Sequence, residues 1–101
     1  MVLFWLKQAD YSMTKRTVTI INKLGLHARA AARFVQTASG FNCDIQVKHG
    51  NREVNGKSIM GIMMLAAGKG AVIDIIAIGK DEAAALDKLE ELILDRFGEC
   101  E

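Results

Sequence analysis

The sequence predicts one α+β domain, a βαββαβα open-faced two-layer sandwich. Strand-like and helix-like hydrophobic periods alternate along the chain from Lys15 onward, with no proline and no long linker between them. Three amphipathic helices can cover only one face of a four-stranded sheet, so the other face is expected to remain open. The chain has 101 residues, of which 50% are hydrophobic and 25% charged, a balance that supports a single hydrophobic core.

The chain begins with a predicted strand and a predicted helix. The β-branched run over residues 17–21 predicts a strand with Val18 and Ile20 facing inward. Apolar residues recur at helical spacing over residues 28–39, which predicts an amphipathic helix that ends at Gly40. The apolar residues that share one face of this helix are Ala30, Ala31, Phe34, Val35 and Ala38.

A hairpin and a short helix are predicted next. Residues 43–47 alternate between apolar and polar types, and turn residues at 49–51 lead into a return strand around 53–54. Ser58 stands where a helix N-cap is expected, because a short apolar stripe follows it and ends at the Gly-Lys-Gly stretch 68–70. The residues of this stripe are Ile59, Ile62, Met63 and Ala66.

A fourth strand and a final helix complete the predicted order. Residues 71–78 form a strongly apolar strand that Gly79 ends. Asp81 and Glu82 place negative charge at the start of the final helix, where the helix dipole favours it. The residues expected to be buried by this helix are Leu86, Leu89, Ile93 and Phe97.

The open sheet face is predicted to carry apolar side chains that the fold does not explain. If alternate residues of the last strand face the helices, then Val72, Ile76 and Ile78 lie where polar residues are expected. We expect either the N-terminal cluster Phe4-Trp5-Leu6 or a second subunit to cover them. Residues 1–14 are interpreted as an N-terminal extension and residues 15–101 as the domain.

Charge and cysteine content disfavour several classes of function. A formal net charge of +1 with interspersed charges gives no basic surface for nucleic acid. Cys43 and Cys100 lie far apart and form no metal-ligand pattern with His27 and His49, so we expect reduced thiols, a buried Cys43, no metal and no cofactor. No run approaches the roughly 20 apolar residues that cross a bilayer, so we expect no membrane insertion and a cytoplasmic location.

Residues 25–31, Gly-Leu-His-Ala-Arg-Ala-Ala, break a local rule at the start of the first predicted helix. Ser, Thr, Asp or Asn would normally cap that start, yet His27 stands there, a position also compatible with a surface or capping role. The first N–H groups of a helix lack intrahelical partners and can bind phosphate. A neutral imidazole is nucleophilic near pH 7, and Arg29 can share the charge of a phosphoryl group. The sequence places no carboxylate, Ser or Cys partner beside His27, which argues against independent hydrolysis.

The same stretch resembles the active-site signature of the HPr family, the phosphocarriers of the bacterial phosphotransferase system. The similarity continues through Gly56-Lys57-Ser58-Ile59-Met60 and Gly79-Lys80-Asp81-Glu82, and covers roughly residues 15–98. It implies a four-stranded antiparallel sheet of order 1-4-2-3. It also implies that enzyme I phosphorylates Nδ1 of His27 at the expense of phosphoenolpyruvate, and that EIIA-type proteins receive the group. Arg29 would stabilise the phosphate, and the protein would be a carrier rather than a turnover enzyme.

The resemblance also bears on Ala30 and Ser58. Ala30 stands where the family more often has proline, which removes no reacting group but favours the helix start less. Ser58 matches the serine that HPr kinase/phosphorylase can phosphorylate in the family, although its hydroxyl also has a plain capping role. Soft apolar surface beside His27 suits a carrier that docks several partners in turn. The predicted docking residues are Ala28, Ala30, Arg33, Ile59, Met60 and Met63.

Two other functions remain open. In one, the protein is a regulatory interaction module whose partners are selected by phosphorylation of His27 and Ser58, without sugar transport. The segment 61–65 resembles proteobacterial members of the family that often serve regulation, and the identity of the partner distinguishes the two uses. In the other, the chain is a small nucleic-acid- or metabolite-binding domain, which the near-neutral charge and few aromatic residues disfavour for nucleic acid.

Overall fold

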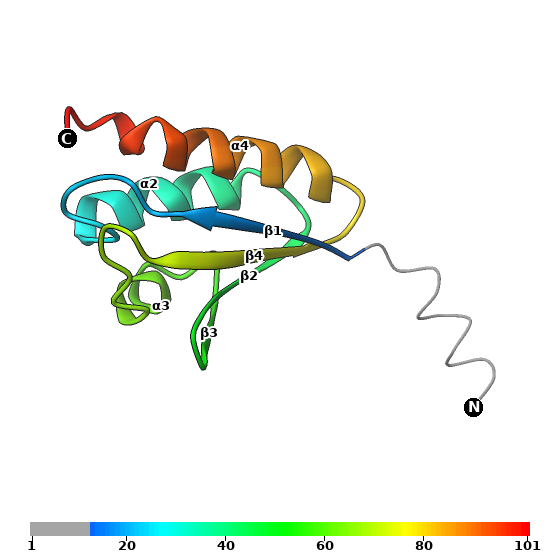
Figure 1. Ribbon diagram of the computed structural model, residues 1–101. Helices are drawn as coiled ribbons and strands as arrows, with labels where there is room; N and C mark the ends of the chain where they lie inside the picture. The colour runs from blue at the N-terminus through cyan, green and yellow to red at the C-terminus, as the bar shows by residue number, and fades with distance from the viewer. Residues whose placement is uncertain (1–12) are drawn as a thin grey trace, which may run out of the picture.

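The computed structural model describes residues 13–101 and confirms the predicted βαββαβα order (Figure 1). The antiparallel sheet has the spatial order β1-β4-β2-β3, as the family resemblance implies. The strands are β1 (Thr14–Thr19), β2 (Asp44–His49), β3 (Arg52–Asn55) and β4 (Val72–Ile78). The helices are α2 (Ala28–Ser39), α3 (Ile59–Met64) and α4 (Glu82–Leu94), and a short 3-10 turn, η1 (Arg96–Gly98), follows α4.

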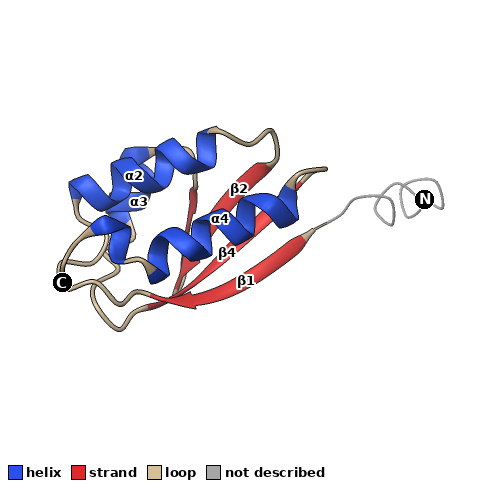
Figure 2. Ribbon diagram, turned by 90° about the horizontal axis from the view of Figure 1, so that it is seen from above, coloured by secondary structure: helices blue, strands red, loops and turns tan. Residues whose placement is uncertain are grey.

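The helices form one layer and the sheet forms the other. Helices α2 and α4 run side by side over one face of the sheet, and the short α3 lies beside α2 at one end (Figures 1 and 2). The chain also ends there, next to the start of α2. Within the described part of the chain, no helix is both long and apolar enough to cross a membrane. The largest fully buried side chains between the layers include Phe34, Phe97, Ile20, Ile45, Ile62, Leu65, Ile73, Ile75, Leu86, Leu89 and Ile93.

Strand β1 is displaced by a few residues from the predicted range 17–21. It begins at Thr14, inside the predicted N-terminal extension, and Val18 and Ile20 are buried as expected. Ile20 lies just past the strand, yet its N–H donates to Ala71 O (2.8 Å) and its carbonyl accepts from Gly70 N (2.7 Å). These two bonds hold the start of the following connector against the sheet.

Helix α3 buries less than its apolar stripe predicts. Of the four stripe residues only Ile62 is buried, whereas Ile59, Met63 and Ala66 are exposed. The stripe therefore faces the core only at Ile62, and the exposure of Ile59 and Met63 agrees with their prediction as docking residues. The physical reason is position: α3 lies at the end of the sheet, and the chain leaves the helix at Leu65, so that Ala66 adopts a left-handed φ of 54°.

Helix α4 ends earlier than predicted. The apolar spacing predicts a helix through Phe97, but α4 stops at Leu94. Arg96 (φ 56°), Phe97 (φ 55°) and Gly98 (φ 78°) are all left-handed, which α-helical backbone does not allow. Phe97 is nevertheless fully buried, so its apolar character predicts its burial correctly and its conformation wrongly.

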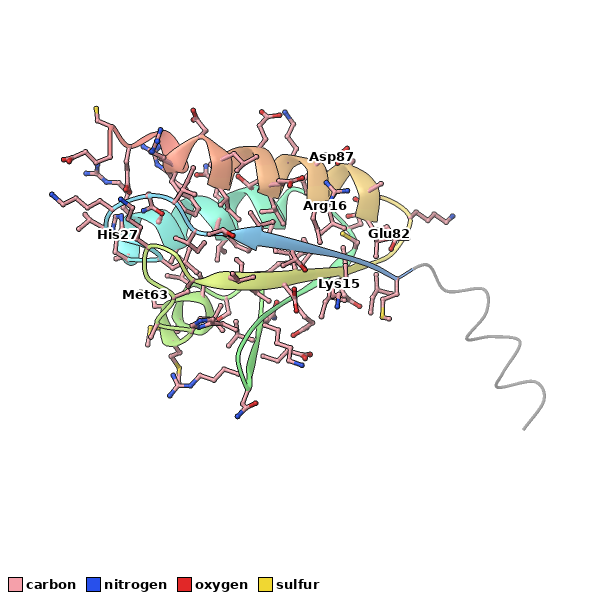
Figure 3. The ribbon with its side chains drawn as sticks, in the orientation of Figure 1. Lys15, Arg16, His27, Met63, Glu82 and Asp87 are labelled. Atoms are coloured by element: carbon pink, nitrogen blue, oxygen red, sulfur yellow. The ribbon has the colours of Figure 1, made fainter. Side chains whose placement is uncertain are left out.

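Polar contacts fix the start and the middle of α4. Arg16 of β1 bonds Asp87 (2.6 Å) and Glu90 (3.1 Å), and Figure 3 shows Arg16 and Asp87 beside each other. Asp81, the N-cap residue of α4, makes no capping bond, because its carboxylate accepts from the amides of Asn42 (2.7 Å) and Cys43 (2.9 Å). These bonds, that of Asn42 first, lower the pKa of Asp81. Cys43 is buried as predicted, and burial raises the pKa of its thiol to about 11.

The open sheet face carries the apolar residues expected there. Val72 is exposed and Ile76 and Ile78 are half-buried, whereas alternate residues of β4 are buried under the helices. Of the two covers expected for them, the cluster at residues 4–6 lies outside the described residues, and a second subunit stays a prediction.

Gly25 allows the connector between β1 and α2 to pack against the loop after α3. Its φ is +66°, and a Cβ atom there would lie 2.6 Å from Ala67 O and 2.7 Å from Gly68 Cα. The amide of the next residue, Leu26, donates to the same Ala67 carbonyl at 2.9 Å. The loop after α3 therefore fixes the position of the backbone at the start of α2.

Substituting Gly25 by alanine is expected to destabilise the protein more than the same change at Gly50. Gly50 has a similar φ of +62°, but among the described residues no atom lies within 4 Å of its would-be Cβ. Gly50→Ala should cost about 1 kcal/mol of backbone strain. Gly25→Ala should cost about 1 to 3 kcal/mol more, because the Ala67 carbonyl must move. Urea denaturation measures both, and equal losses would contradict the close packing of the connector.

Candidate functional site

His27 is itself the N-cap residue of α2. Its backbone is extended (φ −73°, ψ 179°), and its Nδ1 accepts a hydrogen bond from the N–H of Arg29 at 3.3 Å. Its carbonyl accepts the first bond of the helix, from Ala31 N (2.8 Å). The imidazole therefore takes the place of the hydroxyl or carboxylate that usually caps a helix. The side chain is 27% exposed, so it can be reached from solvent.

These contacts assign the proton of the neutral imidazole. Because Nδ1 accepts from a backbone N–H, it carries a lone pair and no proton, and the ring proton is assigned to Nε2. Nε2 lies 2.5 Å from Oε2 of Glu99, and its N–H donates to that carboxylate. The nitrogen that faces the free amides of the α2 first turn is therefore the nucleophilic one.

Glu99 is a residue of this site that sequence reasoning missed. Its carboxylate also accepts from Asn22 Nδ2 (3.1 Å), and Asn22, which is fully buried, donates to Gly25 O (2.9 Å) as well. Burial alone would raise the pKa of Glu99, but the hydrogen bonds from His27 and Asn22 outweigh it and lower this pKa. The expectation that no carboxylate lies beside His27 is wrong.

The chain turn after α4 brings Glu99 to this position. The left-handed residues of η1 reverse the chain, and Arg33 of α2 donates to Phe97 O (2.6 Å). Lys23 N then donates to Glu101 O (2.6 Å), which lays the tail along the connector. Sequence reasoning could have found a break at Gly98, but Glu99 and His27 are 72 positions apart, and no local pattern relates them.

The surroundings of His27 form an open pocket of mixed charge. Arg29 is exposed on the first turn of α2, where its guanidinium can approach a phosphoryl group bound at Nδ1. Lys23 adds a second cation, partly offset by an ion pair with Glu101 at 3.7 Å. The residues that line the pocket are Lys23, Leu24, His27, Ala28, Arg29, Glu99, Cys100 and Glu101.

The predicted docking residues fall into three groups. Ala28, Ile59, Met60 and Met63 are exposed. Figure 3 shows Met63 at the same end of the molecule as His27. The prediction for Ala30 is wrong, because its side chain is fully buried and cannot contact a partner.

Arg33 forms the third group of predicted docking residues. Two further exposed apolar residues were not predicted. Arg33 is exposed, but its guanidinium is engaged by the Phe97 carbonyl, and a docking role for it stays a prediction. Leu24 and Met64 are exposed large apolar residues as well. Leu24 lies in the connector before His27, where its apolar character was the available signal.

Ser58 is the N-cap residue of α3, as predicted. Its side-chain oxygen accepts from Gly61 N at 3.1 Å, and the residue is half-buried. The capping role of Ser58 is thereby confirmed.

Comparison with known proteins agrees with this geometry. A family model described as "PTS HPr component phosphorylation site" matches residues 14–95. The chain is 55% identical over 89 residues to "Phosphocarrier protein HPr" of Neisseria meningitidis serogroup A, covering 88% of this chain and 100% of that protein. The protein of the same name from Cupriavidus necator is 51% identical over the same shares. The crystal structure of HPr-C-His from Thermoanaerobacter tengcongensis superposes with a TM-score of 0.82 at 51% identity, covering 85% of this chain and 97% of that one.

Proposed function

Because the chain belongs to the HPr family of phosphocarriers, we propose that it accepts a phosphoryl group from enzyme I on Nδ1 of His27 and passes it to EIIA-type proteins. In this proposal phosphoenolpyruvate is the original phosphoryl donor. The observation that carries the proposal is the unprotonated Nδ1, whose lone pair accepts a long bond of 3.3 Å from the N–H of Arg29 and can exchange it for phosphorus beside the first-turn amides of α2.

The chemical step follows from this placement. The Nδ1 lone pair attacks phosphorus, a nitrogen–phosphorus bond forms, and the bond from phosphorus to the donor breaks with its electron pair leaving on the donor. The free N–H groups of the helix start and the Arg29 guanidinium stabilise the negative charge on the equatorial oxygens. Because Arg29 is exposed, it can act while either partner protein covers the site. Transfer to the acceptor is the same step in reverse.

The exposed apolar residues beside His27 provide the surface for both partners. Ile59, Met60 and Met63 lie on α3, next to the helix that His27 caps. Methionine side chains are flexible and polarisable, which allows one surface to fit two different proteins. Each partner would cover these residues while it is bound and expose them again when it is released, as a carrier requires.

Incubation with enzyme I and labelled phosphoenolpyruvate tests the proposal. Wild-type protein should take up label that is labile in acid and stable in base, as expected of phosphohistidine. The His27→Ala variant should take up none, because it lacks the acceptor nitrogen. His49→Ala is the matched control and should label normally, since His49 lies on β2, with its Nδ1 3.1 Å from Leu65 O, outside the pocket around His27. Unchanged labelling of His27→Ala would overturn the proposal.

The docking surface is tested by a charge placed on α3. Met60 is 69% exposed, so Met60→Glu should leave the melting temperature unchanged while raising the KM of enzyme I for the protein about tenfold. Met13 is also 69% exposed but precedes β1, away from the site, and Met13→Glu should leave this KM unchanged. Equal KM values for the two variants would remove Met60 from the interface.

Ser58 is proposed as a regulatory phosphorylation site on the same surface, with HPr kinase/phosphorylase as the enzyme. A phosphate at Ser58 would place negative charge next to Met60 and Ile59, where a partner binds. Ser58→Asp should therefore slow labelling by enzyme I. Ser58→Ala, which loses about 1 kcal/mol of capping but gains no charge, should label at the normal rate. If both variants label alike, charge at Ser58 has no regulatory effect.

A further inference from the structure

We propose that Glu99 is a positioning residue for phosphoryl transfer, one that keeps a proton on Nε2 of His27 both before and after Nδ1 is phosphorylated. This inference rests on the proposed function and extends it to a residue on the C-terminal tail. It follows from a carboxylate placed against the ring nitrogen that does not react.

The carboxylate is held in place from several directions. Its side chain is only 15% exposed, one oxygen meets Nε2 of His27 at 2.5 Å, and the other accepts from the buried Asn22 amide at 3.1 Å. The two left-handed non-glycine residues Arg96 and Phe97 bring the tail to this point, at a backbone cost of the kind found at functional sites. Among residues 13–101, no other side chain is hydrogen-bonded to the imidazole.

Glu99 affects the acceptance of the phosphoryl group through charge. When the Nδ1–phosphorus bond forms, the ring still carries its Nε2 proton and becomes cationic. An ionised carboxylate in contact with Nε2–H stabilises that cation, as an aspartate stabilises the imidazolium in hydrolases with a histidine base. The contact also holds the neutral ring with Nδ1 unprotonated and aimed at the α2 amides.

Glu99 affects donation through the leaving group. When the nitrogen–phosphorus bond breaks, its electron pair returns to Nδ1. If Nε2 has kept its proton, the ring leaves as neutral imidazole, whereas a ring that has lost this proton must leave as the strongly basic imidazolate. Holding the proton therefore keeps phospho-His27 competent to donate as the pH rises.

The other charges around the ring do not replace Glu99. Lys23 and Glu101 pair with each other at 3.7 Å, and Arg29, a cation, favours the phosphate rather than the ring proton. The Cys100 thiol lines the same pocket and is exposed. Among these groups, only the Glu99 carboxylate is both negative and hydrogen-bonded to the imidazole.

The test compares Glu99→Gln with wild type in the donation of label from the phosphorylated protein to an EIIA-type acceptor between about pH 6 and about pH 9. Glutamine keeps the shape and a hydrogen-bond acceptor but removes the charge. Loss of a contacting opposite charge should move the decline in donation rate to lower pH by about 1 unit, so that Glu99→Gln donates up to about tenfold more slowly at alkaline pH. Glu91→Gln, on the exposed face of α4, is the matched control and should follow the wild type.

Two measurements keep this inference separate from the proposed function. The ³¹P resonance of phospho-His27 should titrate at lower pH in Glu99→Gln than in wild type, and identical titrations and rate profiles would overturn the role of Glu99 while leaving the carrier function intact. If the wild type takes up no label, the carrier function fails. The Nε2 proton of the unmodified ring still tests the contact, since it should resonate further downfield in wild type than in Glu99→Gln, and equal shifts would disprove it.

Discussion

The site depends on one constraint, the placement of the His27 ring over the first turn of α2 with Nδ1 toward the free amides. Two contacts far apart in sequence set it. Gly25 packs its backbone against the Ala67 carbonyl, which fixes where the chain enters the helix. Glu99 holds the opposite ring nitrogen from the C-terminal tail, which fixes how the ring is turned.

The fold brings the features proposed to bind phosphate and partner proteins to one end of the molecule. The start of α2, helix α3 and the C-terminal tail all lie there, while the rest of the sheet and α4 provide the core that holds them (Figures 1 and 2). The exposed methionines of α3 and the open pocket around His27 are therefore available to a partner at the same time. A carrier needs this arrangement, because its reacting group must be covered by two different proteins in succession.

Much of this architecture could be predicted from local patterns. The alternation in β2 and β4 and the apolar spacing in α2 identify the buried residues, and His27 at a helix start, with Arg29 two residues later, indicates the site. The strand order came from family resemblance, since periodicity carries no information on it. The motif around His27 favours a surface role for Ala30, whereas its helical position turns its side chain into the core.

The features that local patterns could not predict depend on contacts between residues far apart in the sequence. Phe97 has the right spacing to continue α4, and only the packing of the whole domain shows that the chain turns at Arg96 and returns to His27.

The most direct test of the account is heteronuclear NMR of the protein phosphorylated by enzyme I, with ¹⁵N in the histidine rings. The account predicts phosphorus bonded to Nδ1 of His27, whereas phosphorus on Nε2, or on any other residue, would contradict it.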